Sequence, residues 1–258
     1  MARYQVILAY DGTEYQGFQK QARARTVQGV VENALWKLNW SGSSLLAAGR
    51  TDTGVHASGQ VIAFDLDWGH SPSELLRALN AHLPPDVAAR DIRIASPEFH
   101  PRYQAVSRCY RYHIFCEPLR SPLKERYAWR VWPVTDLTRL QAAASRLTGE
   151  HDFSAFGTPS KTGGKTIRTV SRAEWFEQGP LLVFEIVSQA FLYHMVRRLV
   201  SFQVEIGQGR HEVEQLVEHL SAPPAGLAQG LAPAQGLVLV EVHYETGVVG
   251  QVGLDNEE

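Results

Sequence analysis

The spacing of apolar residues predicts alternating strands and helices in the first half of the chain. Residues 3–10, RYQVILAY, alternate between polar and apolar side chains as a half-buried strand does. Apolar residues at helical spacing follow Thr26, which predicts a helix with this threonine as its N-cap. Later patterns predict two more strands, at 45–48 and 60–66. A Ser-Pro-Ser-Glu capping box then opens a helix at residue 71, and a closing strand follows at 87–95.

The second half repeats this order of elements without any residue-level repeat. It predicts a strand, a helix capped by Thr135 and ended by Gly149, a hairpin around Gly179-Pro180, a long helix and a last strand. The first strand covers 110–116, and the hairpin covers 172–176 and 181–187. The long helix covers 191–206, and the last strand covers 237–244. Each half therefore has the order βαββαβ, the split βαβ arrangement. We expect an α+β fold with halves at 1–100 and 101–258.

Composition is that of a soluble globular protein. The chain has 258 residues, of which 44% are hydrophobic and 20% charged. No apolar run reaches the length of a membrane-spanning helix, and no signal-peptide segment precedes the first strand. We therefore expect a cytoplasmic protein.

Charge is segregated along the chain although the net charge is only −2. Residues 101–130 contain seven Arg or Lys against two Glu, and residues 161–172 contain four bases and no acid. From residue 205 to the end there is one Arg against nine acids. This distribution fits a basic RNA-binding surface as well as it fits chance variation of solvated charges.

The two cysteines, Cys109 and Cys116, lie seven positions apart on one expected strand and would point to opposite faces. A disulfide between them is not expected. No cysteine and histidine spacing typical of a zinc site occurs, so we predict no metal.

The stretch with the clearest chemical content is Gly49–Gln60, GRTDTGVHASGQ. Its glycines, threonines and serine predict a loop that could aim the carboxylate of Asp52 at a ligand. Arg50 would favour the ionised form of that carboxylate if it folds close to it. Taken alone, Asp-Thr-Gly is also ordinary turn chemistry.

This stretch resembles the signature of the TruA-type tRNA pseudouridine synthases, which is close to GRTDxGVHxxxQV. Four other segments resemble motifs of the same family in the same order. They are Tyr10–Gln19, Phe99–Tyr112, Phe191–Val200 and Ala232–Val242.

The resemblance implies two ferredoxin-like halves with joined sheets and an RNA-binding cleft between them. It implies conversion of uridine to pseudouridine in the anticodon stem-loop, at tRNA positions 38, 39 and 40. It further implies no cofactor, tRNA as the partner, and a homodimer.

The resemblance also assigns the site residues, with Asp52 as the catalytic aspartate. Its carboxylate could attack C1′, add to C6 of the base, or remove the C2′ proton, and sequence leaves these routes open. Tyr110 matches the active-site tyrosine, which could stack on the uracil and assist proton removal at C5. A tyrosine packed in the core is the alternative, and Tyr112 on the same strand face could be mistaken for it.

Three further residues match binding positions of the family. Arg197 matches the basic residue of HMVR. It lies on an apolar helix face, where a charge is costly unless it meets an anion, and it would pair with Asp52, whereas Arg198 would face solvent. Arg50 would help to hold the target base out of the stack or bind a phosphate. Leu237 would pack against the catalytic tyrosine, a role compatible with ordinary core packing.

Two other functions compete with the synthase. The DTG at Asp52 also occurs in aspartic proteases, but these need two carboxylates sharing one proton, and Arg50 would oppose that sharing. A noncatalytic ferredoxin-like RNA-binding module is the stronger alternative, because a degenerate family member can retain the fold. Its aromatic-rich sheets would then serve as stacking platforms. We expect the enzyme, since four residues of the family's site occur together: Arg50, Asp52, Tyr110 and Arg197.

Overall fold

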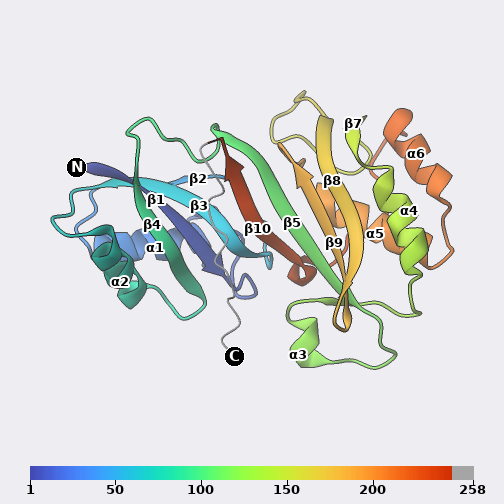
Figure 1. Ribbon diagram of the computed structural model, residues 1–258, viewed down its shortest axis with the longest axis horizontal. Helices are drawn as coiled ribbons and strands as arrows, with labels where there is room; N and C mark the ends of the chain where they lie inside the picture. The colour runs from blue at the N-terminus through green and yellow to red at the C-terminus, as the bar shows by residue number, and fades with distance from the viewer. Residues whose placement is uncertain (246–258) are drawn as a thin grey trace. The chain divides into compact units, whose positions relative to one another are not determined.

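The computed structural model describes residues 1–245, which form two compact units (Figure 1). One unit comprises Met1–Val106 and the chain from Leu239, and the other comprises Ser107–Val238. The strands β5 (Ala105–Phe115) and β10 (Leu237–Tyr244) each run across the boundary. The domain division at residue 100 stays a prediction, and the two units are described separately below.

The first unit is built on an antiparallel sheet with β1 (Ala2–Tyr10) at its centre. β1 pairs with β3 (His56–Leu66) on one side and with β4 (Val87–Ala95) on the other. The short β2 (Leu46–Ala47) pairs with the other side of β3, so these strands lie in the order β4-β1-β3-β2. This is the strand order that a βαββαβ chain gives when each helix connects parallel strands across one intervening strand.

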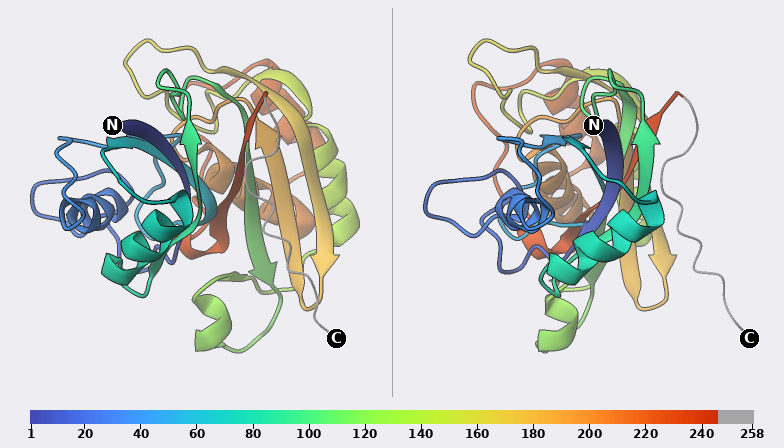
Figure 2. Two further views of the ribbon diagram at one scale, coloured as in Figure 1. Left: turned by 60° about the vertical axis from the view of Figure 1, so that its left-hand side comes forward. Right: turned by 90° about the vertical axis from the view of Figure 1, so that its left-hand side faces the viewer.

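The two helices of this unit begin where the sequence predicts. α1 (Val27–Trp36) has Thr26 as its N-cap, and the threonine side chain accepts from the amide of Gly29. α2 (Pro72–His82) opens with the capping box, in which Ser71 and Glu74 each accept from the other's amide. α1 and α2 contact each other and lie side by side in Figure 2. Both caps satisfy amides that the first turn of a helix leaves unpaired.

The second unit has an antiparallel sheet in the order β5-β9-β8-β7. β9 (Leu181–Ser188) pairs with both β5 and β8 (Ile167–Gln178), and β7 (Gly149–Asp152) forms the outer strand. The short β6 (Trp129–Arg130) runs parallel to β5. The remaining elements are α3 (Pro122–Glu125), α4 (Leu137–Ser145), α5 (Met195–Gly207), α6 (Val213–Ser221) and the 3-10 turn η1 (Ala234–Gly236). The predicted hairpin is confirmed as β8 and β9, with extra elements before and after it.

Two predicted boundaries are wrong for local reasons. The N-cap of α4 is Asp136, which accepts from the amides of Thr138 and Arg139, while Thr135 is buried beside it. The helix also ends at Ser145, and Gly149 begins the next strand.

A third predicted boundary, the start of the helix expected at 191–206, is also wrong. α5 begins at Met195, because His194 adopts a left-handed conformation with φ 65° and breaks the helix before it. The segment 191–194 is therefore not helical, and within it Tyr193 forms an isolated β-bridge with Thr158. Tyr193, inside the predicted helix, is exposed and lies before its actual start.

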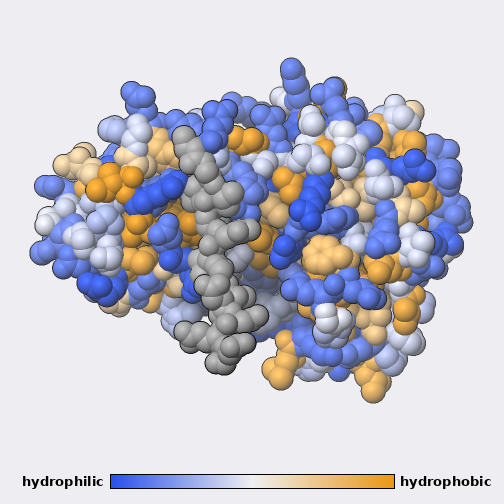
Figure 3. Space-filling model, in the orientation of Figure 1, coloured by the Kyte–Doolittle hydropathy of each residue, from blue (hydrophilic) through white to orange (hydrophobic). Residues whose placement is uncertain are grey.

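The α+β class is confirmed by these sheets and helices. Among residues 1–245, no helix is both long and apolar enough to cross a lipid bilayer. Hydrophilic side chains take up much of the face shown in Figure 3, with smaller apolar areas between them. Neither cysteine forms a disulfide.

Candidate active site

Asp52 occupies the first position of a tight turn in the first unit. The amide of Val55 donates to the carbonyl of Asp52 at 3.2 Å, and Gly54 has a φ of 77°. A positive φ at the third turn position is costly for other residues, so the Thr-Gly of the motif follows from the turn. The side chain of Asp52 is half-buried, between a buried Thr51 and an exposed Thr53. The turn thus fixes the backbone and leaves the carboxylate accessible.

Thr51, directly before the aspartate, is held by both its main chain and its side chain. Its carbonyl accepts from the amide of Phe18 at 3.0 Å. Its hydroxyl lies 2.8 Å from the hydroxyl of Tyr10, at the end of β1. Burial raises the pKa of Tyr10 to about 12, so its hydroxyl is neutral and remains a hydrogen-bonding group at physiological pH.

The segment that includes Gly12 and Gly17 packs directly on the aspartate turn. A Cβ on Gly12 would lie 2.0 Å from the carbonyl oxygen of Val55, and one on Gly17 would lie 3.0 Å from that of Thr51. The amide of Gly54 donates to the carbonyl of Tyr15 at 3.3 Å. No role is predicted from sequence for this Tyr10–Gln19 motif, and the structure assigns it one. It is the support of the turn.

Two residues of β3 complete the support. The amide of Gly12 donates to Nδ1 of His56 at 2.9 Å, and Oδ1 of Asp11 lies 3.2 Å from the same nitrogen. Nε2 of Gln60 donates to the carbonyl of Gly49 at 3.0 Å. The predicted strand at 60–66 begins too late and leaves His56 in the loop, which is wrong, because β3 already begins at His56 and pairs with the end of β1. The irregular part of the motif is therefore shorter than predicted.

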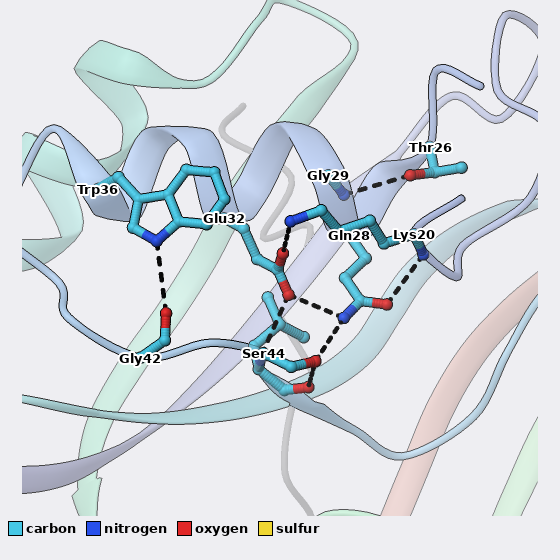
Figure 4. A network of polar contacts seen from close by, with 9 residues as sticks. Lys20, Thr26, Gln28, Gly29, Glu32, Trp36, Gly42 and Ser44 are labelled. Atoms are coloured by element: carbon cyan, nitrogen blue, oxygen red, sulfur yellow. Dashed lines mark hydrogen bonds and ion pairs between the residues drawn. The ribbon is translucent and has the colours of Figure 1, made fainter. Parts of the chain in front are cut away.

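A buried polar network holds the end of the supporting segment (Figure 4). Glu32 of α1 is fully buried and accepts from Nζ of Lys20 at 2.8 Å, from Nε2 of Gln28 at 2.8 Å and from the amide of Leu45 at 3.2 Å. The side-chain oxygen of Gln28 in turn accepts from the main-chain amide of Lys20. The main-chain amide of Gln28 donates to the carbonyl of Phe18. Since the amide of Phe18 donates to the carbonyl of Thr51, α1 is connected to the aspartate turn through Gln28, Phe18 and Thr51.

Arg50 lies in the same loop and is exposed. The residue before it is fixed by Gln60, and the residue after it is fixed by Tyr10. Its guanidinium is therefore carried on a fixed backbone at the surface beside Asp52. This location suits the predicted contact with a base or phosphate.

In the second unit, Tyr110 of β5 is the accessible tyrosine of its strand face. It is half-buried, and the ring of Phe191 packs edge-on against it, with ring centroids 5.1 Å apart. Tyr112 is fully buried and donates its hydroxyl to the carbonyl of Pro233 at 2.6 Å. Burial raises the pKa of Tyr112 well above its usual range. Only Tyr110 of the two can offer its ring to a ligand, and the sequence analysis missed Phe191 as the residue that orients it.

Arg197 projects from the first turn of α5 and is half-buried. Its Nε donates to the carbonyl of Ala232 at 2.7 Å, which fixes the guanidinium against the segment before β10. Arg198 is wrongly predicted to face solvent, because its Nη1 donates to the carbonyls of Ala228 and Gly230. Leu237, the first residue of β10, is 6% exposed, as expected for a packing residue.

The predicted site residues are thus distributed between the two units. Asp52 and Arg50 belong to the first unit, and Tyr110, Arg197 and Leu237 belong to the second. The pairing of Asp52 with Arg197 and the contact of Leu237 with Tyr110 stay predictions. Within residues 1–245, no group of His, Cys, Asp and Glu side chains is arranged to hold a metal ion.

Comparison with known proteins identifies a family over most of the chain. A family model described as tRNA pseudouridine synthase matches residues 6–104 and 143–245. A tRNA pseudouridine synthase A from Chloroflexus aurantiacus is 40% identical, covering 95% of this chain and 89% of the relative. Enzymes of the same name from Limosilactobacillus fermentum and Geobacter sulfurreducens are 39% and 40% identical over 95% of this chain, which covers 97% and 100% of their own lengths.

Proposed function

The chain belongs to the tRNA pseudouridine synthases, an isomerase family, and from this premise we propose that it converts uridine to pseudouridine in the anticodon stem-loop of tRNA, at positions 38, 39 and 40. The observation that carries the proposal is the construction around Asp52. A half-exposed carboxylate sits on a turn held by β1, by β3 and by the segment between β1 and α1. Such support is what a catalytic group needs to meet its substrate in one geometry.

The reaction breaks the C1′–N1 bond of uridine, turns the uracil and forms a C1′–C5 bond. The proton on C5 must leave, and N1 must gain a proton, so atoms balance within an isomerisation. Asp52 acts on the nucleotide by attack on C1′, addition to C6 or removal of the C2′ proton, and each route needs an accessible ionised carboxylate. The location of Asp52 on the surface of its turn supports all three.

The other residues act on the target base and its backbone. Tyr110 stacks on the flipped uracil and assists removal of the C5 proton, which its accessible ring supports. Arg197, fixed through Nε on Ala232, pairs with the carboxylate of Asp52. Arg50 holds the base out of the stack or binds a phosphate, and Leu237 packs against Tyr110.

We include three features of the working enzyme in this proposal. It uses no cofactor, because an isomerisation needs no external electron or group donor. It acts in the cytoplasm, where tRNA is processed. It is a homodimer, because one tRNA is longer than one 28.8 kDa protomer and a second subunit can hold the tRNA body.

The test is release of tritium from an unmodified tRNA transcript containing 5-tritiated uridine. Replacing uridine with cytidine at positions 38, 39 and 40 singly and together locates the reaction. Release that disappears with the triple replacement supports the proposed positions. Release that persists with it overturns those positions, and tRNA binding without any release favours the noncatalytic RNA-binding module.

A further inference from the structure

A surface pocket of about 400 Å³ lies in the second unit, and none of the residues assigned above lines it. It is lined by residues of β7, of the segment before β8, of β8 itself and of the chain that follows β9. The lining residues used below are Glu150, Lys165, Arg168, Thr169 and Gln189. Lys165 and Thr169 are exposed, so the pocket opens at the surface.

Arg168 presents a guanidinium in a fixed orientation. Its Nη1 donates to the carbonyl of Lys165 at 2.9 Å and to that of Ile167 at 2.7 Å. Its Nε is buried and has no acceptor among residues 1–245. Burial also lowers the pKa of Arg168. The two carbonyls hold the charge of this lining guanidinium in place, so an anion in the pocket would meet a cation that is already oriented.

The charge around the pocket is positive. Lys165 adds a second cation, and the hydroxyl of Thr169 adds a further donor. Glu150 is the one acidic residue of the lining and is exposed on β7. Two cations and a hydroxyl against one carboxylate favour an anionic ligand with several oxygens, and a guanidinium suits a phosphate group well.

The pocket is connected to Tyr110 through short stretches of chain. The carbonyl of Gln189, a lining residue, accepts from Nη1 of Arg108 at 2.6 Å, and Arg108 lies two residues before Tyr110 on β5. Two residues beyond Gln189, Phe191 packs its ring against Tyr110. A nucleotide stacked on Tyr110 would therefore have its neighbouring backbone near this pocket.

We propose that this pocket binds a phosphodiester of the tRNA backbone close to the target uridine. The inference rests on the proposed function, because it takes the ligand to be the RNA substrate. Arginine, lysine and threonine are among the side chains that contact nucleic-acid phosphates, and such contacts fix the register of the RNA without reading its sequence. The pocket would set which nucleotide reaches Tyr110.

The experiment measures the dissociation constant of an unmodified tRNA transcript as salt concentration is varied. Arg168→Gln and Lys165→Gln should each weaken binding and lower the slope of log affinity against log salt by about 1. Glu150→Gln should strengthen binding, because it removes the negative charge from the lining. Arg77→Gln on the exposed face of α2 makes the same charge change elsewhere and serves as the matched control.

Lys165 is exposed, so its variant reports on the pocket even if the Arg168 variant folds poorly. Unchanged slopes for Lys165→Gln and Glu150→Gln, or a slope change as large for Arg77→Gln, would overturn the proposal. Inorganic phosphate at constant ionic strength provides a second arm. If it competes with tRNA for the wild type but not for Arg168→Gln, the pocket is the anion site; equal competition contradicts it.

Failure of this inference can be told apart from failure of the proposed function. Tritium release from wild-type enzyme reports the chemistry, whereas the salt slope reports the phosphate contact. Release with unchanged slopes in the pocket variants would keep the synthase and reject the pocket.

Discussion

The hydroxyl oxygen of Tyr10 lies 2.8 Å from Oγ1 of Thr51, so the last residue of β1 is bonded to the residue directly before Asp52. Both side chains are buried. The bond joins two segments that are 41 positions apart in sequence. It connects β1, which pairs with both β3 and β4, to the turn that carries Asp52.

Tyr10→Phe should lower the rate of tritium release more than it lowers tRNA affinity. Loss of the bond should cost about 1 kcal/mol of stability, and a misplaced carboxylate should slow the reaction by about 10-fold to 100-fold. Single-turnover kinetics and urea unfolding measure the two effects. Tyr4→Phe, at the far end of the same strand, is the control. If Tyr10→Phe and Thr51→Val had fully additive effects on rate, the hydrogen bond would have no part in positioning Asp52.

Stability should fall at alkaline pH, because the pKa of Tyr10 is about 12 in the folded protein and about 10 in the unfolded chain. A folded pKa that is raised means that the stabilisation is complete below pH 10 and is lost as pH rises toward 12. Tyr10→Phe should reduce this alkaline slope by up to about 1.4 kcal/mol per pH unit. Urea unfolding between pH 9 and pH 11 measures it, and a slope equal to that of the wild type would contradict this account of Tyr10.

Glu32→Gln should destabilise the first unit and loosen the aspartate turn. The carboxylate is fully buried and accepts from Lys20, Gln28 and the amide of Leu45, so the substitution removes the partner of a charge and should cost about 3 kcal/mol. Glu98→Gln is an exposed control with the same change of charge. A cost below about 0.5 kcal/mol, the range of ordinary surface substitutions, would show that the network in Figure 4 contributes little.

Tyr110→Phe and Tyr112→Phe should separate catalysis from stability. Tyr110→Phe should keep the fold and tRNA binding but slow label release by about 100-fold or more if, as proposed, the hydroxyl assists proton removal. Tyr112→Phe leaves the carbonyl of Pro233 without its donor and should cost about 1–3 kcal/mol with little change in rate. Tritium release and thermal unfolding of both variants decide the assignment. The opposite pattern would make Tyr112 the active-site residue.

Local patterns predict the elements that depend on local interactions. The caps at Thr26 and Ser71 are confirmed, because each is a bond within four residues of sequence. The strand at 237–244 is confirmed to the residue, since its alternation matches its burial. Thr135 fails as a cap because the neighbouring Asp136 can make the same bonds and lies in the right position to do so.

The parts that sequence could not predict depend on distant partners. Residues His56–Gln60 have poor strand propensity but are paired because β1 lies beside them. The helix break at His194 depends on a left-handed backbone conformation. The sequence does not indicate it, because the residue there is a histidine and not a glycine. The motif at Gly49–Gln60 revealed Asp52 through its resemblance to a family, but the support from Tyr10, Gly12 and Phe18 emerges only once the chain is folded.

The most direct test of the central claim is tritium release by wild type, Asp52→Ala and the exposed-strand control Asp91→Ala on one unmodified tRNA. If Asp52 is the catalytic residue, wild type and Asp91→Ala release the label, while Asp52→Ala, still folded and binding tRNA, is slower by more than about a hundredfold. Release by Asp52→Ala at the wild-type rate would contradict the catalytic role of the turn.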